Sequence, residues 1–262
     1  LLDCNNLERF SFLQGNANPG HILLDMASKT SLLNYTAYAI DPDLMVVLQL
    51  RILLLQIIQQ DMELGGIIQP KELFENQLFD RILTMPLWRP SSNTMEDFPE
   101  RTSLSKLEVP ESKIADGEWH EILFNLSLLD RNGKMVTLIT NSTLANNLSV
   151  KTRQALVEKG YIESIIELPD RLLENTGIEL YAVVLSYGNK GIKFLDASQF
   201  YTEQRRKKDI DVTTVLENLD NPEVCRFESI ESIAREGYNL LPKRYTLKTN
   251  IIDGVPLGEI CN

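Results

Sequence analysis

Between Gly133 and Asp196 the apolar positions of the chain follow strand and helix periods in turn. The runs at 134–140, 162–168 and 180–187 are short and rich in β-branched residues, which is typical of strands. The run at 151–159 has helical spacing instead. The pair Asn132-Gly133 is a turn signal just before the first of these strands. This half of the chain is therefore predicted to be α/β.

The first half of the chain carries further strand signals. Short apolar runs at 21–24 and 36–40 predict strands, and each is followed at once by an acid, Asp25 and Asp41. The run at 79–84 predicts another strand.

Two helices are predicted between these strands. Pro42 suits the first turn of a helix that continues over 44–58, where nearly every face is apolar, so this helix is expected to be widely buried. An amphipathic pattern predicts a second helix at 118–129. Because crossover connections are right-handed, strands and helices in this order favour a doubly wound, mostly parallel sheet with helices on both faces.

The composition is that of a globular domain, with 262 residues, 43% hydrophobic and 24% charged. The apolar run at 44–58 is broken by Gln49, Arg51 and Gln56, so no membrane span is expected. The N-terminus shows no pattern of a basic segment followed by an apolar one. A cytoplasmic location is therefore the default expectation.

With a net charge of −11, the chain has no overall excess of basic residues with which to bind DNA. Basic residues do cluster at 205–208 and at Lys243-Arg244, either as solvated loops or as nucleic-acid contacts. Metal and nucleophile chemistry is not indicated, because the cysteines and histidines lie far apart in the chain and no serine sits in a nucleophile elbow. The residues concerned are Cys4, Cys225, Cys261, His21 and His120.

Residues 133–196 resemble, nearly end to end, the C-terminal half of the modification (M) subunit of type I restriction enzymes, in the N6-adenine DNA methylase family. The resemblance rests on Gly133, Leu168-Pro169, the loop 175–178 and the closing 194–196, and residues 236–245 are similar to the family's ending. It implies a Rossmann-like methyltransferase fold with S-adenosylmethionine as the cofactor. It also implies DNA as a partner, together with specificity and restriction subunits or a fused recognition domain.

In that family the cofactor turn is written D-P-x-C-G-S-G. Aligned at Asp25, the turn here has Lys29 and Ser31 in place of both glycines, which would block a close approach of the backbone to the cofactor. The resemblance implies that Asp25 contacts the methionine end of the cofactor and that Asp41 binds its ribose. Both acids also suit a turn or a helix cap. Asp25 and Asp41 are only sixteen positions apart, whereas a turn, a helix and a strand need about twenty or more residues.

The family's catalytic motif is N-P-P followed by an aromatic residue. The corresponding residues here are Met85-Pro86-Leu87-Trp88. Methylation of adenine N6 needs acceptors for the amino group and an aromatic face for the flipped base. Pro86 keeps a backbone carbonyl and Trp88 keeps the aromatic face, or packs in the core, but a methionine thioether is only a weak acceptor.

These residues favour a methyltransferase-like domain of a restriction-modification system that binds cofactor poorly or is inactive, and that serves a structural or DNA-positioning role. The alternatives are an active DNA adenine-N6 methyltransferase and a protein-interaction module without nucleic-acid binding. The domains are predicted as 1–196 for the methyltransferase-like part, 197–250 for an extension and 251–262 for the possible start of a target-recognition module.

Overall fold

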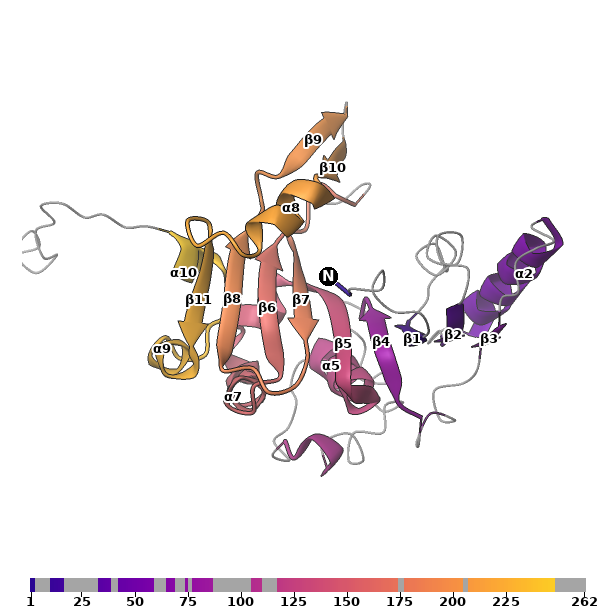
Figure 1. The fold of residues 1–262 in the computed structure, drawn as a ribbon, viewed down its shortest axis with the longest axis horizontal. Helices are drawn as coiled ribbons and strands as arrows, with labels where there is room; N and C mark the ends of the chain where they lie inside the picture. Colours follow the sequence, from indigo (N-terminus) through magenta and orange to yellow (C-terminus); the bar gives the residue numbers. More distant parts are fainter. Residues whose placement is uncertain are drawn as a thin grey trace, which may run out of the picture.

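A single large sheet organises the chain (Figure 1). The computed structural model describes residues 1–2, 10–16, 33–38, 42–58, 65–68, 74, 77–86, 105–109, 117–173, 177–204 and 207–247. Within these residues, the strand order of the large sheet is β11-β8-β6-β7-β5-β4-β1-β2-β3, and β9 and β10 form a separate hairpin. The strands are β1 (Phe10–Gly15), β2 (Leu33–Ala37), β3 (Gly65–Ile68), β4 (Phe79–Thr84), β5 (Leu129–Thr140), β6 (Ile162–Glu167), β7 (Leu180–Leu185), β8 (Gly191–Asp196), β9 (Tyr201–Gln204), β10 (Lys207–Ile210) and β11 (Cys225–Ser229).

Most neighbouring strands of the large sheet are parallel. The pairs β1–β2, β2–β3, β1–β4, β4–β5 and β6–β8 are parallel, whereas β7 runs antiparallel to both β5 and β6, and β11 runs antiparallel to β8. The parallel strands therefore all end at the same edge of the sheet, here called the carboxyl edge. The prediction of a mixed α/β fold with a mostly parallel sheet is confirmed.

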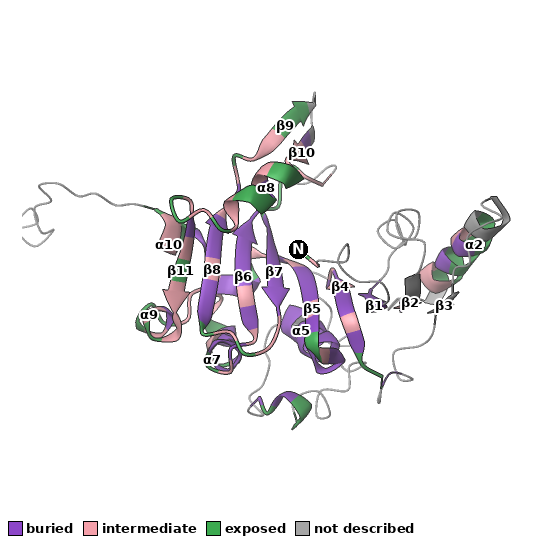
Figure 2. Ribbon diagram, in the orientation of Figure 1, coloured by how far each residue is buried: buried purple, intermediate pink, exposed green. Residues whose placement is uncertain are grey.

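Helices cover both faces of the sheet. Side chains of β7 alternate between the two faces, because Tyr181 and Val183 belong to one apolar cluster while Leu180 and Ala182 belong to another. The first cluster includes residues of α5, α7 and α9, and the second includes Val215 of α8. The central strands are accordingly buried almost throughout (Figure 2). The described helices are α2 (Pro42–Ile58), α5 (Gly117–Ser127), α6 (Asn141–Ala145), α7 (Val150–Glu158), α8 (Val212–Asn218), α9 (Ile230–Arg235) and α10 (Lys243–Thr246), with a short 3-10 turn at Asn147–Ser149.

Several element boundaries agree with the sequence patterns. The strand predicted at 79–84 is β4, and the helix predicted to begin near Pro42 does begin there. The predicted Asn-Gly turn falls inside β5, where the pairing with β4 slips: Phe79 lies opposite Leu129 but Arg81 lies opposite Lys134. The strand predicted at 21–24 lies outside the described residues.

The prediction that the helix over 44–58 is widely buried is wrong. Of its described side chains, only Leu48 and Ile52 are buried. A stripe on the opposite side has side chains that are 42–56% exposed, and its members are Val46, Val47, Leu50, Leu53 and Leu54. Apolar composition on all faces did not imply burial on all faces. None of the described helices has the length and hydropathy needed to cross a bilayer.

The chain beyond Asp196 packs closely against the sheet. β11, which lies in the predicted extension, pairs with β8. Tyr245 stacks on Phe194 of β8 with ring centroids 4.1 Å apart. The backbone N–H of Leu240 donates to the carbonyl of Leu144 at 3.1 Å. The extension thus shares the core of the sheet, the domain boundary at 196 stays a prediction, and residues 251–262 lie outside the described part.

Candidate functional site

The strand order of the sheet reverses between β1 and β4. From β1 the chain continues outward to β2 and then to β3, whereas β4 pairs with the other side of β1. Open α/β sheets bind ligands in the crevice outside the carboxyl ends of the strands at such a reversal. The described residues at this place are Gly15 and Thr84, which end β1 and β4, and Asn16, Met85 and Pro86, which follow them.

A buried polar cluster lies directly beneath this reversal. Thr84 donates its hydroxyl proton to Oε1 of Glu121 at 2.9 Å, and the Tyr38 hydroxyl lies 3.5 Å from the same oxygen. Asn125, one turn further along α5, donates through Nδ2 to the Tyr38 hydroxyl at 2.7 Å and to the carbonyl of Glu121 at 2.8 Å. We call these four residues the polar hub. It connects the ends of β2 and β4 through one face of α5.

Burial fixes the protonation of the hub tyrosine. Burial raises the pKa of Tyr38 well above its usual value, and the nearby Glu121 carboxylate raises this pKa further. Tyr38 therefore remains a hydroxyl donor at all ordinary pH values. Because both side chains are buried and hydrogen-bonded to each other, the hub is suited to hold the strand ends in place.

Gly15 brings β1 into contact with the same hub. A Cβ at Gly15 would lie 2.6 Å from Oδ1 of Asn125 and 2.9 Å from both the Thr84 and the Tyr38 hydroxyl oxygens. These separations are far below van der Waals contact, so only glycine allows the backbone of β1 to lie this close. The carboxyl ends of three strands therefore meet on α5.

Asn16 links the end of β1 to the end of β4. It has a positive φ of 50°, a conformation that asparagine tolerates better than most residues. Its Nδ2 donates to the carbonyl oxygen of Met85 at 3.0 Å. The Met85 side chain is half-buried and Pro86 is buried. The backbone around the predicted catalytic motif is thus held by β1.

The predicted site residues are only partly described. Pro86 is buried and follows the end of β4 at the reversal, and its role in a base pocket stays a prediction. Asp25, Asp41 and Trp88 lie outside the described residues, so their roles stay predictions. The structure brings Pro86 close to the end of β1, which the sequence reasoning did not identify as a strand. The apolar residues of 10–13, followed by glycine and asparagine at 15–20, were the signal that could have found it.

The position of β1 changes one inference about the cofactor. β1 and β2 are parallel neighbours joined by residues 16–32. This connection is long enough for a helical crossover. The short spacing from Asp25 to Asp41 therefore does not bear on the connection between β1 and β2.

The described residues do not by themselves form a pocket for S-adenosylmethionine. Two carboxylates of α5 lie near the carboxyl edge, but Glu121 binds Thr84, and Glu118 accepts hydrogen bonds from Thr140 and Thr143. Among the described residues, the side-chain oxygen Oε1 of Gln14 is a buried acceptor without a hydrogen-bond partner. One amide oxygen does not replace the two acids that the ammonium and ribose groups of this cofactor call for.

No other chemistry is assembled in the described part of the chain. Its acids, cysteines and histidines form no group that could hold a metal ion. Cys225 is a free, buried thiol whose pKa is raised by burial. His120 is buried on α5. The reversal between β1 and β4 is therefore the candidate site.

Comparison with known proteins identifies similar sequences. A sequence profile described as N-6 DNA Methylase matches residues 45–253. The match covers β4 and Pro86 and begins after β1 and β2. A methylase subunit of the type I restriction enzyme MjaIX from Methanocaldococcus jannaschii is 23% identical over 208 residues, which are 70% of this chain and 37% of that protein. The chain thus spans little more than a third of the length of this curated relative.

Solved structures show the same fold. A type I restriction-modification methyltransferase subunit from Streptococcus thermophilus superposes with a TM-score of 0.72 at 20% identity, covering 90% of this chain and 54% of that one. A protein from Listeria monocytogenes, described as a class I S-adenosylmethionine-dependent methyltransferase, gives a TM-score of 0.57 at 13% identity, covering 82% and 65% of the two chains. At these identities the likeness concerns the fold alone.

Proposed function

Because the chain belongs to the N-6 DNA methylase family, we propose that it is the methyltransferase-like domain of a DNA restriction-modification enzyme in which methyl transfer is impaired. The observation that carries the proposal is the end of β4. Met85 stands there beside Pro86, at the point where the strand order reverses. The chemistry of the site then depends on what these two residues can offer to a base.

Transfer of a methyl group to an exocyclic amine needs acceptors that orient the lone pair of the amine toward the methyl donor. The Met85 side chain offers only a weakly accepting sulfur. Its backbone carbonyl already accepts a hydrogen bond from Asn16. Pro86 can contribute a carbonyl and Trp88 an aromatic face, so the proposed base pocket is a remnant with one good acceptor. For comparison, removing one preorganised oxyanion-hole donor costs an enzyme about 2.7–4 kcal/mol of transition-state stabilisation.

Cofactor binding is proposed to be weak for a related reason. Asp25 and Asp41 are the proposed contacts to S-adenosylmethionine, as the family resemblance implies. Asp25 would stand in a turn with Lys29 and Ser31 in place of glycines. The described end of β1 adds Gln14, a neutral acceptor, to this set. A neutral amide stabilises an ammonium group less than a carboxylate does.

A calorimetric titration with S-adenosylmethionine tests this part of the proposal. Weak or undetectable heat at millimolar cofactor is the expected result. Binding in the micromolar range would contradict the loss of the pocket. In that case a second titration with Gln14→Leu and Asp25→Asn would show which strand end holds the cofactor.

The proposed partners are DNA and the specificity and restriction subunits of such a system, or a recognition domain fused to the same chain. The related structures include a type I restriction-modification subunit, and the fold is shared with it. The domain would then position recognition or restriction modules in the cytoplasm. The alternative is an active adenine-N6 methyltransferase, in which Asp25 and Asp41 hold the cofactor and Pro86 and Trp88 hold the base.

A second candidate function, a protein-interaction module, is favoured by α2. Its exposed aliphatic stripe leaves five large side chains 42–56% exposed. Contiguous exposed apolar patches mark surfaces that contact other proteins or membranes. Mixing the protein with duplex DNA at low salt discriminates this function, because an interaction module without nucleic-acid binding leaves the mobility of the DNA unchanged.

A further inference from the structure

The large sheet ends on one side in β11, and this strand forms a regular edge (Figure 1). Its five residues pair with β8 in continuous register. Within the described residues, no strand pairs with the other side of β11. Natural edge strands often prevent further pairing with a proline, a lysine or a bulge, and β11 has none of these. Its outer side therefore lacks the usual obstacles to a further strand.

The backbone of Phe227, in the middle of β11, points away from β8. A Cβ at Gly191 of β8 would lie only 2.2 Å from the carbonyl oxygen of Glu228, so this carbonyl faces β8. The N–H of Cys225 donates to the carbonyl of Asn221 at 2.8 Å instead of to β8. Successive residues of an antiparallel strand direct their backbone groups to alternate sides. Since Glu228 faces β8, the N–H and C=O of Phe227 face outward.

The ring of Phe227 is exposed and yet held in place. Its side chain is 61% exposed. A Cβ at Gly191 would lie 2.6 Å from Cζ of this ring, so the ring rests directly on the glycine of β8. A side chain that is already held loses little conformational entropy when a partner binds. Because aromatic residues stabilise a sheet when they lie opposite one another on neighbouring strands, Phe227 is suited to a contact across the edge.

Charged residues flank Phe227 on both sides along the strand. Arg226 precedes it and Glu228 follows it, and both side chains are partly exposed. They lie on the sheet face opposite to the Phe227 ring, since side chains of a strand alternate between faces. The hydroxyl of Ser232 donates to Oε2 of Glu228 at 2.6 Å, which holds the carboxylate beside the strand. The strand thus carries a positive and a negative charge at equal distances from its centre.

A second copy of β11, laid antiparallel against the first, fits this pattern. With Phe227 opposite Phe227 of the other copy, Arg226 of each copy lies opposite Glu228 of the other. Pairs at such positions have Cα atoms about 4.5 Å apart, which brings the side chains close together. A shift of the centre by one residue would place Arg226 opposite Arg226, or Glu228 opposite Glu228, and like charges in opposite positions are destabilising. Charge therefore selects a single register.

We propose that β11 is a self-complementary edge through which two copies of the chain associate and join their large sheets. The inference does not depend on the proposed function, since it needs neither cofactor nor DNA. One five-residue strand from each copy makes a small interface, so the dimer is weak and reversible.

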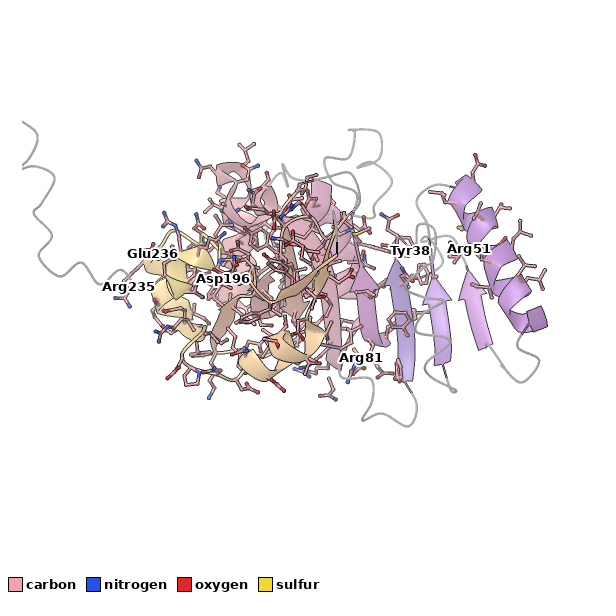
Figure 3. All side chains as sticks on the ribbon, turned by 90° about the horizontal axis from the view of Figure 1, so that it is seen from above. Tyr38, Arg51, Arg81, Asp196, Arg235 and Glu236 are labelled. Atoms are coloured by element: carbon pink, nitrogen blue, oxygen red, sulfur yellow. The ribbon has the colours of Figure 1, made fainter. Side chains whose placement is uncertain are left out.

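The position of β11 keeps this association away from the candidate site. Arg235 and Glu236, which follow β11 closely in the chain, lie at the opposite end of the sheet from Tyr38 of the polar hub (Figure 3). Because the paired strands run antiparallel, the carboxyl edges of the two copies point in opposite directions. Each copy of the dimer therefore keeps its own candidate site accessible.

Sedimentation velocity of the full chain, over a hundredfold range of concentration that approaches the millimolar, tests the edge. The wild type is expected to shift from monomer toward dimer as the concentration rises. Arg226→Glu and Glu228→Arg each place like charges at both pairs, so each variant alone is expected to self-associate at least about tenfold more weakly.

Mixing these two variants provides the decisive comparison. In a mixed dimer, the two acids of one variant lie opposite the two arginines of the other, so the mixture is expected to dimerise like the wild type. The double variant Arg226→Glu/Glu228→Arg exchanges both charges within one chain and is expected to self-associate like the wild type for the same reason.

Matched controls make the same charge changes on other surfaces. Arg131 of β5 and Glu217 of α8 are exposed. Arg131→Glu and Glu217→Arg are expected to dimerise like the wild type. A wild type that stays monomeric throughout, a dimer that both edge variants retain, or a mixture that fails to recover would each overturn the self-complementary edge. All three results leave the proposed methyltransferase-like function intact.

Discussion

Replacing Gly15 with alanine probes the contact between β1 and the polar hub. The added Cβ would lie 2.6 Å from Oδ1 of Asn125 and 2.9 Å from the hydroxyl oxygens of Thr84 and Tyr38. None of these side chains can turn into solvent, because all three are buried. Either the backbone of β1 shifts, or hydrogen bonds of the hub break.

The magnitude follows from these two costs. Overpacking a buried site costs about 1–3 kcal/mol. Loss of the bond from Asn125 to the Tyr38 hydroxyl adds about 1 kcal/mol. The sum is about 2–4 kcal/mol, which corresponds to a melting temperature lower by about 5–15 °C for a domain of this size.

Thermal unfolding followed by circular dichroism measures this difference. Gly177→Ala is the control, since a Cβ at Gly177 meets no atom of the described residues within 4 Å and its φ lies outside the left-handed region. The control should melt within about 2 °C of the wild type, because surface substitutions away from such features change stability by about 0.5 kcal/mol or less. If Gly15→Ala has the same melting temperature as the wild type, β1 does not pack on the polar hub as described, and the location of the candidate site loses its support.

Two further substitutions test other buried and capping contacts. Arg153 is buried and donates to the carbonyls of Tyr238 and Asn146, both at 2.8 Å. Arg153→Met should therefore lower the free energy of unfolding, measured in urea, by about 2–5 kcal/mol, and Arg153→Lys should recover only part of this loss. A loss below about 1 kcal/mol in Arg153→Met would refute the role of these hydrogen bonds. Asp211 caps α8 by accepting from the backbone N–H of Thr214, and this bond lowers the pKa of the carboxyl. A carboxyl whose pKa is lower in the native state than in the unfolded state stabilises the fold at pH values above its unfolded pKa. This stabilisation is lost as the pH falls through the native pKa. Asp211→Ala should therefore melt below the wild type at neutral pH, with a gap that closes in acid, and a gap that is constant with pH would contradict this.

The sequence was most informative where the chain is apolar and regular. β4, β6 and α7 were predicted nearly to the residue, because each is a short run with a clear period that tertiary packing does not override. β1 was missed since Gln14 and Gly15 end a run that otherwise carries only a few apolar residues. The consequence was a cofactor turn placed at Asp25, a prediction that the described residues do not test.

Other features depend on contacts that no local pattern encodes. One face of α2 is exposed although the helix is apolar on nearly every face, so composition alone gave the wrong expectation of burial. The polar hub joins Tyr38, Thr84, Glu121 and Asn125 across almost ninety positions of sequence. Pairings of this kind become visible only when strand order is known. The same holds for Lys208, whose charge suggested solvent and whose side chain is buried.

The most direct test of impaired methyl transfer is a radiolabelled transfer assay, with the purified full chain, S-adenosylmethionine and mixed-sequence duplex DNA. An adenine-N6 methyltransferase of known activity serves as the positive control. With Met85 in place of an amide, the wild type is expected to leave the DNA unlabelled. Labelled N6-methyladenine in the product, lost on Trp88→Ala, would contradict this expectation and identify an active enzyme.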